Sequence, residues 1–117
     1  MPDDKVRPAP NFAHMVFFQL IDTSDHAIDT FVVACIEYLA NHDGQIHFSV
    51  GLRAVDIERD VSDTGFDVAM HIIFESREKY DDYAGNPRHD EFITVTAGMS
   101  TGRRVLDSYI ERAVAGL

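Results

Sequence analysis

Tyr83 and His89 are the residues of this chain whose types and spacing best suit chemistry, because they flank Pro87. Proline lacks a backbone N–H and disfavours helical geometry at Asn86, so one helix should end near Gly85 and another begin near Pro87. Tyr83 then lies just before an elbow between two helices, and His89 just after it. A phenol with a pKa of about 10 and an imidazole with a pKa of about 6.5 would form an acid and base pair there.

Both residues also have a purely structural interpretation. His89 would bond a backbone group at the elbow, and Tyr83 would fill the core with its hydroxyl at the surface. The sequence leaves both interpretations open, and it names no substrate.

The composition excludes several classes of function. With 117 residues, of which 45% are hydrophobic, the chain fits one globular domain. Its net charge of −10 repels phosphate backbones and anionic membranes, so neither nucleic acid nor a membrane is an expected partner. No stretch approaches the roughly 18 to 20 apolar residues that span a bilayer. The single cysteine, Cys35, falls on the apolar side of an expected helix. These features predict a soluble protein of the reducing cytoplasm.

The first half of the chain predicts a strand, a helix and a second strand. Residues 14–21 are apolar on both faces, which is typical of a central strand. Residues 23–25 offer helix caps, and apolar residues then recur every three or four positions until 41–44. His26 and His42 flank this helix and are expected to be solvated. From Ile46 to Leu52 the pattern alternates as in a strand with one face on a core.

The second half of the chain predicts a loop, a strand, two helical pieces and a last strand. The acidic stretch 56–65 predicts a solvated loop, with a cation site as the less favoured alternative. Residues 66–74 alternate as a strand, and Ser76 begins a helix that reaches the elbow, after which a further helical piece runs toward Met99. Residues 100–102 are expected to turn the chain into a last strand at 105–110.

This order predicts an α+β fold, the ferredoxin-like βαββαβ plan with an antiparallel sheet and its helices on one face. The domain is expected at 14–112, between a disordered N-terminal tail at 1–13 and a C-terminal tail at 113–117. Because the first strand is apolar on both sides, the free sheet face would carry a large apolar patch. We therefore expect a homodimer through the sheet faces.

The sequence gives little support to metal or nucleotide chemistry. It holds no HExxH, CxxC or glycine-rich phosphate loop. His47 and His71 would share the second sheet face with Asp67, but a metal site there is a weak alternative. We expect neither a metal nor a cofactor.

Three segments together resemble a known family: the opening strand His14-Met15-Val16-Phe17-Phe18, the strand end Phe74-Glu75-Ser76, and the element Pro87-Arg88-His89. From about residue 14 to residue 111 the chain resembles the stress-responsive A/B barrel (Dabb) family. The resemblance implies a dimeric α+β barrel in which two ferredoxin-like sheets pack together and enclose a cavity.

The resemblance also implies roles for particular residues. The family's nearest known activity, that of olivetolic acid cyclase, closes a linear polyketide by aldol chemistry without a cofactor. Its catalytic tyrosine and histidine align with Tyr83 and His89, and its auxiliary histidine and aspartate align with His14 and Asp107. As a hypothesis, His89 would take a proton from a carbon next to a carbonyl, and Tyr83 would donate a hydrogen bond to the enolate oxygen. Where that enzyme has a further histidine before the proline, this chain has Asn86.

His14 and Asp107 would orient the imidazole or a water, or would pair only to hold strand register. The expected ligand is small and apolar or aromatic, and the reaction would be cofactor-independent acid–base chemistry of a cyclase or lyase type. The alternative is a non-catalytic stress-related binding protein or structural dimer. The candidate ligand-binding residues are Val16, Phe18, Phe31, His71 and Asn86.

Overall fold

The structure, a computed structural model, describes residues 10–116. Most of the expected N-terminal tail, residues 1–9, therefore lies outside the described residues. The elements in chain order are β1 (Phe12–Leu20), α2 (Asp25–Leu39), β2 (Gln45–Leu52), β3 (Val68–Phe74), α3 (Arg77–Ala84), α4 (Pro87–Val95) and β4 (Ser100–Tyr109). The expected order of strands and helices is confirmed.

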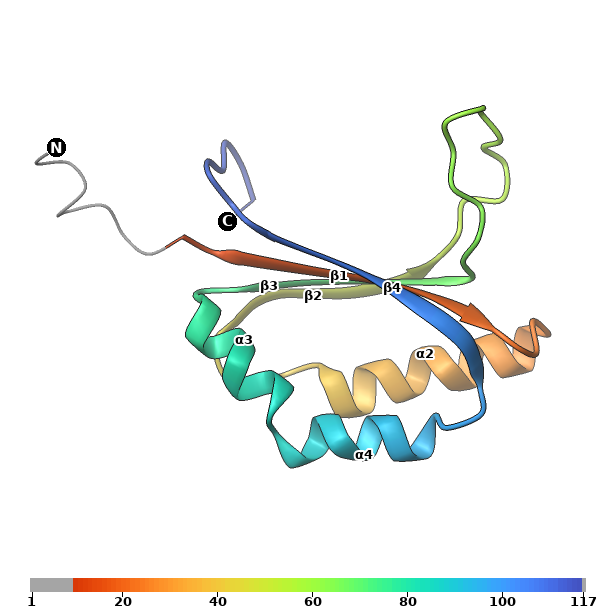
Figure 1. Ribbon diagram of the computed structural model, residues 1–117, viewed down its shortest axis with the longest axis horizontal. Coiled ribbons are helices and arrows are strands. Elements are labelled where there is room, and N and C mark those ends of the chain that lie inside the picture. Colours follow the sequence, from red (N-terminus) through yellow and green to blue (C-terminus); the bar gives the residue numbers. More distant parts are fainter. Residues whose placement is uncertain (1–9, 117) are drawn as a thin grey trace, which may run out of the picture.

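The four strands form one antiparallel sheet in the order β2-β3-β1-β4. All three helices cover the same face of this sheet (Figure 1). The ferredoxin-like α+β fold predicted from the sequence is thus confirmed. Because β1 lies between β3 and β4, residues on its helix side meet the helices and two neighbouring strands at once.

The core lies between the sheet and the helices. Alternate residues of β1 and β3 point into it, as their pattern predicted, and α2 adds Phe31, Cys35 and Leu39. Each fully buried aliphatic or aromatic side chain stabilises the fold by about 1.5–3 kcal/mol. Burial also raises the pKa of the Cys35 thiol to about 12, so this cysteine stays protonated and unreactive.

The elbow that the sequence predicted is formed by helices α3 and α4. Gly85 ends α3, and the Asn86 side chain accepts a hydrogen bond from the Arg88 N–H while Pro87 occupies the first turn of α4. The Arg88 guanidinium donates to the carbonyls of Glu37 and Ala40, at 2.5 and 3.2 Å. Because those carbonyls lie at the end of α2, this arginine fastens the elbow to α2.

Several boundaries differ from the expectation. Strand β1 begins at Phe12 rather than His14, and α4 ends at Val95 rather than near Met99. Residues 100–102 are part of β4 and not a turn, because Ser100 and Gly102 pair with β1.

The expectation that His42 is solvated was wrong. Its side chain folds back so that its Nε2 lies 2.8 Å from the Tyr38 carbonyl, and only 8% of the residue is exposed. His26, by contrast, is exposed as expected.

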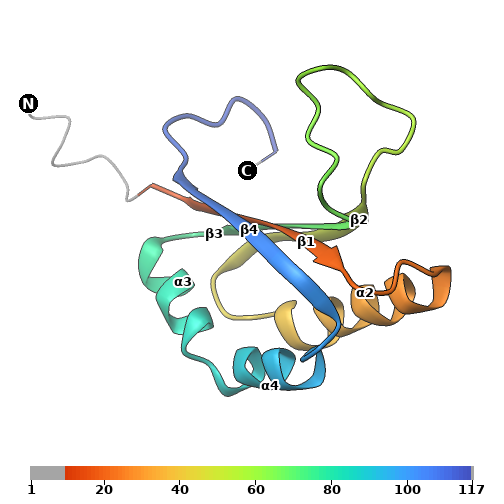
Figure 2. The same ribbon diagram turned by 45° about the vertical axis from the view of Figure 1, so that its right-hand side comes forward.

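The face of the sheet opposite the helices carries no helix. The loop between β2 and β3 and the segment after β4 rise on this side, as two views of the chain agree (Figures 1 and 2). We call this helix-free face of the sheet the open face. None of the helices in residues 10–116 is long and apolar enough to cross a membrane.

Candidate functional site

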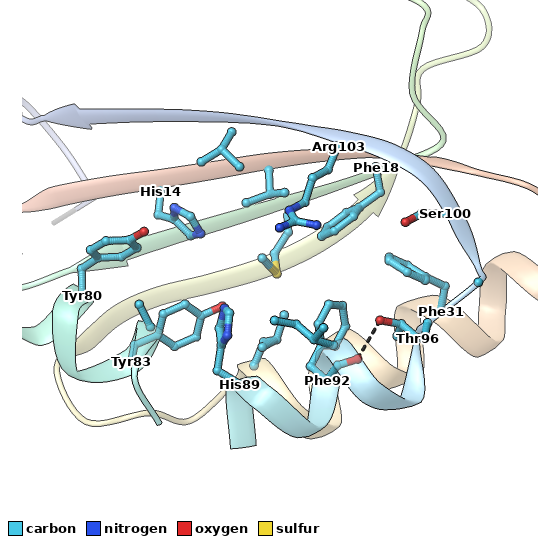
Figure 3. A pocket seen from close by; sticks show the side chains of 18 residues that line it. His14, Phe18, Phe31, Tyr80, Tyr83, His89, Phe92, Thr96, Ser100 and Arg103 are labelled. Atoms are coloured by element: carbon cyan, nitrogen blue, oxygen red, sulfur yellow. Dashed lines mark hydrogen bonds between the residues drawn. The ribbon is translucent and has the colours of Figure 1, made fainter. Parts of the chain in front are cut away.

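A cavity of about 340 Å³ lies between the helix side of the sheet and helices α3 and α4 (Figure 3). Its volume falls in the range of small-molecule sites. Apolar and aromatic side chains make up most of its wall, and Val105 and Ile93, which are 46% and 51% exposed, mark where it reaches solvent. The cavity lies within a single chain, on the opposite side of the sheet from the open face.

Tyr83, in the last turn of α3, is one wall of this cavity and is only 2% exposed. Its ring packs against Phe74 and His42, with centroids 5.0 and 4.9 Å apart. Its hydroxyl is buried and has no hydrogen-bond partner in the described residues. Burial raises the pKa of Tyr83 well above its usual value, with smaller contributions from Cys35 and Tyr80. The phenol therefore stays protonated and is available as a hydrogen-bond donor.

His89, in the first turn of α4, faces Tyr83 edge-on with the ring centroids 5.0 Å apart. Its Nδ1 is buried and, like the Tyr83 hydroxyl, finds no partner in the described residues. Burial lowers the pKa of His89; the charges of His14, His42 and Arg103 act in the same direction, and Asp90 acts against them. The imidazole is therefore neutral at neutral pH and able to accept a proton.

These two atoms are unusual because buried polar groups are almost always hydrogen-bonded. In residues 10–116 they are the buried side-chain nitrogen and oxygen atoms that lack a partner. Each such group costs about 1–3 kcal/mol when it is left unpaired. Both belong to side chains that line the same cavity.

The side chains of His14 and Asp107 form a hydrogen bond across neighbouring strands at the edge of the cavity. They are directly opposite in the β1–β4 register, and the His14 Nδ1 lies 2.6 Å from the Asp107 carboxylate. A carboxylate can only accept, so Nδ1 carries the proton in this bond and Nε2 of a neutral His14 is left as the acceptor. The carboxylate thus fixes both the tautomer and the orientation of the ring.

The structure brings most of the candidate residues together. Val16, Phe18 and Phe31 line the cavity with His14, Tyr83 and His89, and the rings of Phe18 and Phe31 meet edge to face at 4.8 Å. Asp107 reaches the cavity only through His14. One end of the cavity is therefore lined by apolar side chains such as Phe18 and Phe31, and the other end carries Tyr83 and His89 (Figure 3).

His71 and Asn86 lie outside this cavity. His71 is on the open face, with its ring 6.3 Å from that of Phe17, and the Asn86 side chain caps α4. Neither is among the residues of the cavity wall.

The alternative metal site is also not assembled. The His47 Nε2 lies 2.9 Å from the Ser49 hydroxyl, and the Asp67 carboxylate accepts from the Leu20 N–H. Within the part of the chain that the structure describes, no three His, Cys, Asp or Glu residues lie close enough to hold a metal ion.

Sequence reasoning missed Tyr80, Thr96, Ser100 and Arg103, which also line the cavity. A signal for Arg103 was present, because residues 103, 105 and 107 share one face of a strand and Asp107 was already assigned to the site. It was not used because the last strand was expected to begin only at Val105.

Comparisons with known proteins agree with this architecture. A family model described as the Stress Responsive A/B Barrel Domain (Dabb) matches residues 12–110. No curated protein matches the chain.

Solved structures with the same fold come from bacteria and plants. A dimeric ferredoxin-like protein of unknown function from Thermobifida fusca YX aligns over 87% of this chain and 92% of its own, with a TM-score of 0.71 and 14% identity. A Dabb family protein from Mesorhizobium loti MAFF303099 covers 85% and 95%, with a TM-score of 0.69 and 21% identity. The hydroxynitrile lyase from Passiflora edulis covers 92% and 100%, with a TM-score of 0.68 and 20% identity.

Proposed function

The chain belongs to the stress-responsive A/B barrel (Dabb) family, and we propose that its cavity binds a small apolar or aromatic carbonyl compound and transfers a proton on it without a cofactor. One observation carries this proposal. The Tyr83 hydroxyl and the His89 Nδ1 are buried in one cavity wall and lack partners in the described residues. A hydrogen-bond donor and a base that line the same cavity are the parts that general acid–base catalysis needs.

In the proposed step, neutral His89 removes a proton from the carbon next to the substrate carbonyl. The C–H bond breaks, its electron pair forms the enolate, and the proton stays on the imidazole until it is returned or passed on. The Tyr83 hydroxyl donates a hydrogen bond to the carbonyl oxygen, where negative charge develops. Positioned proton transfer of this kind contributes about a hundredfold to ten-thousandfold to a rate.

The His14–Asp107 pair has a positioning role in this proposal. Its short bond leaves His14 Nε2 as an acceptor beside the Tyr80 and Tyr83 rings, whose centroids lie 4.9 and 6.0 Å from that of His14. There it would orient a water or a substrate hydroxyl. A protein with this fold is named a hydroxynitrile lyase, and this supports the proposed lyase type of chemistry.

The protein is further proposed to act as a homodimer through its open face. Met15, Phe17 and Leu106 give this face apolar side chains, and Leu106 is 56% exposed. Similar structures are described as dimeric, which supports the proposal. A location in the cytoplasm stays a prediction from the sequence.

The rival function is non-catalytic binding by a stable dimer. The deep packing of Tyr83 favours it, since a ring held against Phe74 and His42 contributes to stability whatever its hydroxyl does.

Deuterium exchange into 2-tetralone, a compact aromatic ketone with acidic α-hydrogens, separates the two functions. In D₂O, followed by NMR, the wild-type protein should exchange these hydrogens faster than buffer, and His89→Gln and Tyr83→Phe should each lose about a hundredfold or more of that acceleration. His26→Gln, which removes an exposed histidine, should retain it. If 2-tetralone binds but exchanges no faster than in buffer, the protein is a binder and the catalytic proposal fails.

A further inference from the structure

Arg103 extends from β4 into the cavity, between His14 and Phe18 (Figure 3). It lies opposite Phe18 in the β1–β4 register, so its side chain leaves the sheet on the helix side. Tyr83 and His89 reach the cavity from α3 and α4, on the other side. A molecule in the cavity would therefore lie between the guanidinium and the proposed catalytic pair.

This guanidinium forms no ion pair with any residue among 10–116. Its neighbour Arg104 gives the contrast. Arg104 points to the open face and pairs with the Asp63 carboxylate. Of these two adjacent arginines, Arg104 has a carboxylate partner within the protein, and Arg103 has none among residues 10–116.

The cavity wall contains no aspartate or glutamate, and Arg103 is its one permanently charged residue. The nearby Asp107 carboxylate is already bonded to His14. In a chain with a net charge of −10, a cation facing an otherwise neutral cavity is a local exception. A guanidinium offers a planar fork of N–H donors that matches a carboxylate.

We infer that Arg103 selects ligands that carry a carboxylate, so that the molecule bound in the cavity is a flat, largely apolar organic acid. The inference rests on the proposed function, because it names the class of ligand that the same cavity takes. The carboxylate is held at β4, the apolar body packs among Val16, Phe18 and Phe31, and the reacting carbonyl lies toward Tyr83 and His89. Arg103 is in this account a specificity-determining residue.

A matched pair of probes tests this. 2-Naphthoate and 2-naphthamide have nearly the same shape, and only the first is an anion at neutral pH. Isothermal titration of the full-length wild-type protein should show tighter binding of the naphthoate. Arg103→Met should weaken naphthoate binding roughly tenfold and weaken naphthamide binding much less, since an ion pair with the ligand is lost only for the naphthoate. Arg103→Lys should keep part of the preference.

Arg104→Met is the control, because it makes the same change in net charge one residue away on the opposite face. It should leave the preference intact. Added salt should reduce the wild-type preference, which provides a test that needs no variant. Equal binding of the two probes by wild type, or a preference that survives Arg103→Met, would overturn the inference and leave the proposed ligand cavity standing. Failure of both probes to bind would instead remove the proposed function, and the inference with it.

Discussion

The protonation of His89 is coupled to folding, because its pKa is lowered in the folded chain. Its Nδ1 lacks a partner in the described residues, and burial together with neighbouring positive charge disfavours its protonated form. Protonation of His89 should therefore lower the stability of the folded chain, and this effect can be measured.

The pH dependence of stability should report His89 directly. The pKa of His89 is lower in the folded chain than in the unfolded chain, so the unfolded chain binds the proton first as the pH falls through about 6.5. The free energy of unfolding should thus decrease as the pH is lowered through this window, and the decrease should be smaller in His89→Gln. Urea unfolding between about pH 7.5 and pH 5 measures it, with His26→Gln as the control. If His89→Gln and wild type lose the same free energy of unfolding on acidification, protonation of His89 does not destabilise the fold.

The hydroxyl of Tyr83 should be dispensable for folding. Because it has no partner in the described residues, Tyr83→Phe removes a buried unpaired group and should leave the free energy of unfolding unchanged or raise it by up to about 3 kcal/mol. Tyr83→Leu removes the packed ring and should cost roughly 2–4 kcal/mol. Chemical denaturation compares them. A loss well above 1 kcal/mol in Tyr83→Phe would mean that the hydroxyl holds the fold together.

At this scale the sequence predicted the pair but not its surroundings. Tyr83 and His89 were identifiable because a proline between them sets the elbow locally. Arg103 and the burial of His42 depend on contacts between segments distant in the sequence or on how the chain leaves a helix, and residue type alone does not encode these.

The α3–α4 elbow is the element that positions both catalytic candidates. Tyr83 lies before it, His89 after it, and Arg88 ties it to the end of α2. A change that loosens the start of α4 should therefore affect ligand binding as well as stability.

Two helix caps make a matched test of this point. Asn86 caps α4, the helix that carries His89, whereas the exposed Ser24 caps the start of α2. Asn86→Ala and Ser24→Ala should each cost about 1 kcal/mol in free energy of unfolding. Only Asn86→Ala should also weaken 2-tetralone binding, because it frees the turn that holds His89. Equal effects of the two variants on binding would show that the elbow does not position the site.

The elements themselves were largely predictable, because strand alternation and helix caps are local signals. The start of β4 was not. Ser100, Thr101 and Gly102 have the composition of a turn, and they are drawn into the strand by pairing with the end of β1.

For the molecule as a whole, the open face is the surface through which we propose that the protein dimerises. It lies away from the cavity, so a partner seated there would leave the cavity within each chain. Assembly and ligand binding should therefore be separable by mutation.

Leu106→Glu should convert the proposed homodimer into monomers. The substitution places a carboxylate on the open face, where burial against a partner would cost more than the interface gains. Light scattering coupled to size exclusion measures the mass. Val33→Glu is the control, because Val33 is 50% exposed on the outer side of α2. A dimeric Leu106→Glu variant, or a monomeric wild type, would contradict the proposed interface.

The central claim, that the ligand site is the cavity holding Tyr83 and His89, is best tested with the six histidines as reporters. His14, His42 and His89 lie around the cavity, whereas His47 and His71 lie on the open face. In ¹⁵N-histidine NMR, addition of 2-tetralone should shift the ring nitrogens of His89 most and leave those of His47 and His71 unchanged. Shifts confined to His47 and His71 would place the ligand on the open face instead and contradict the account.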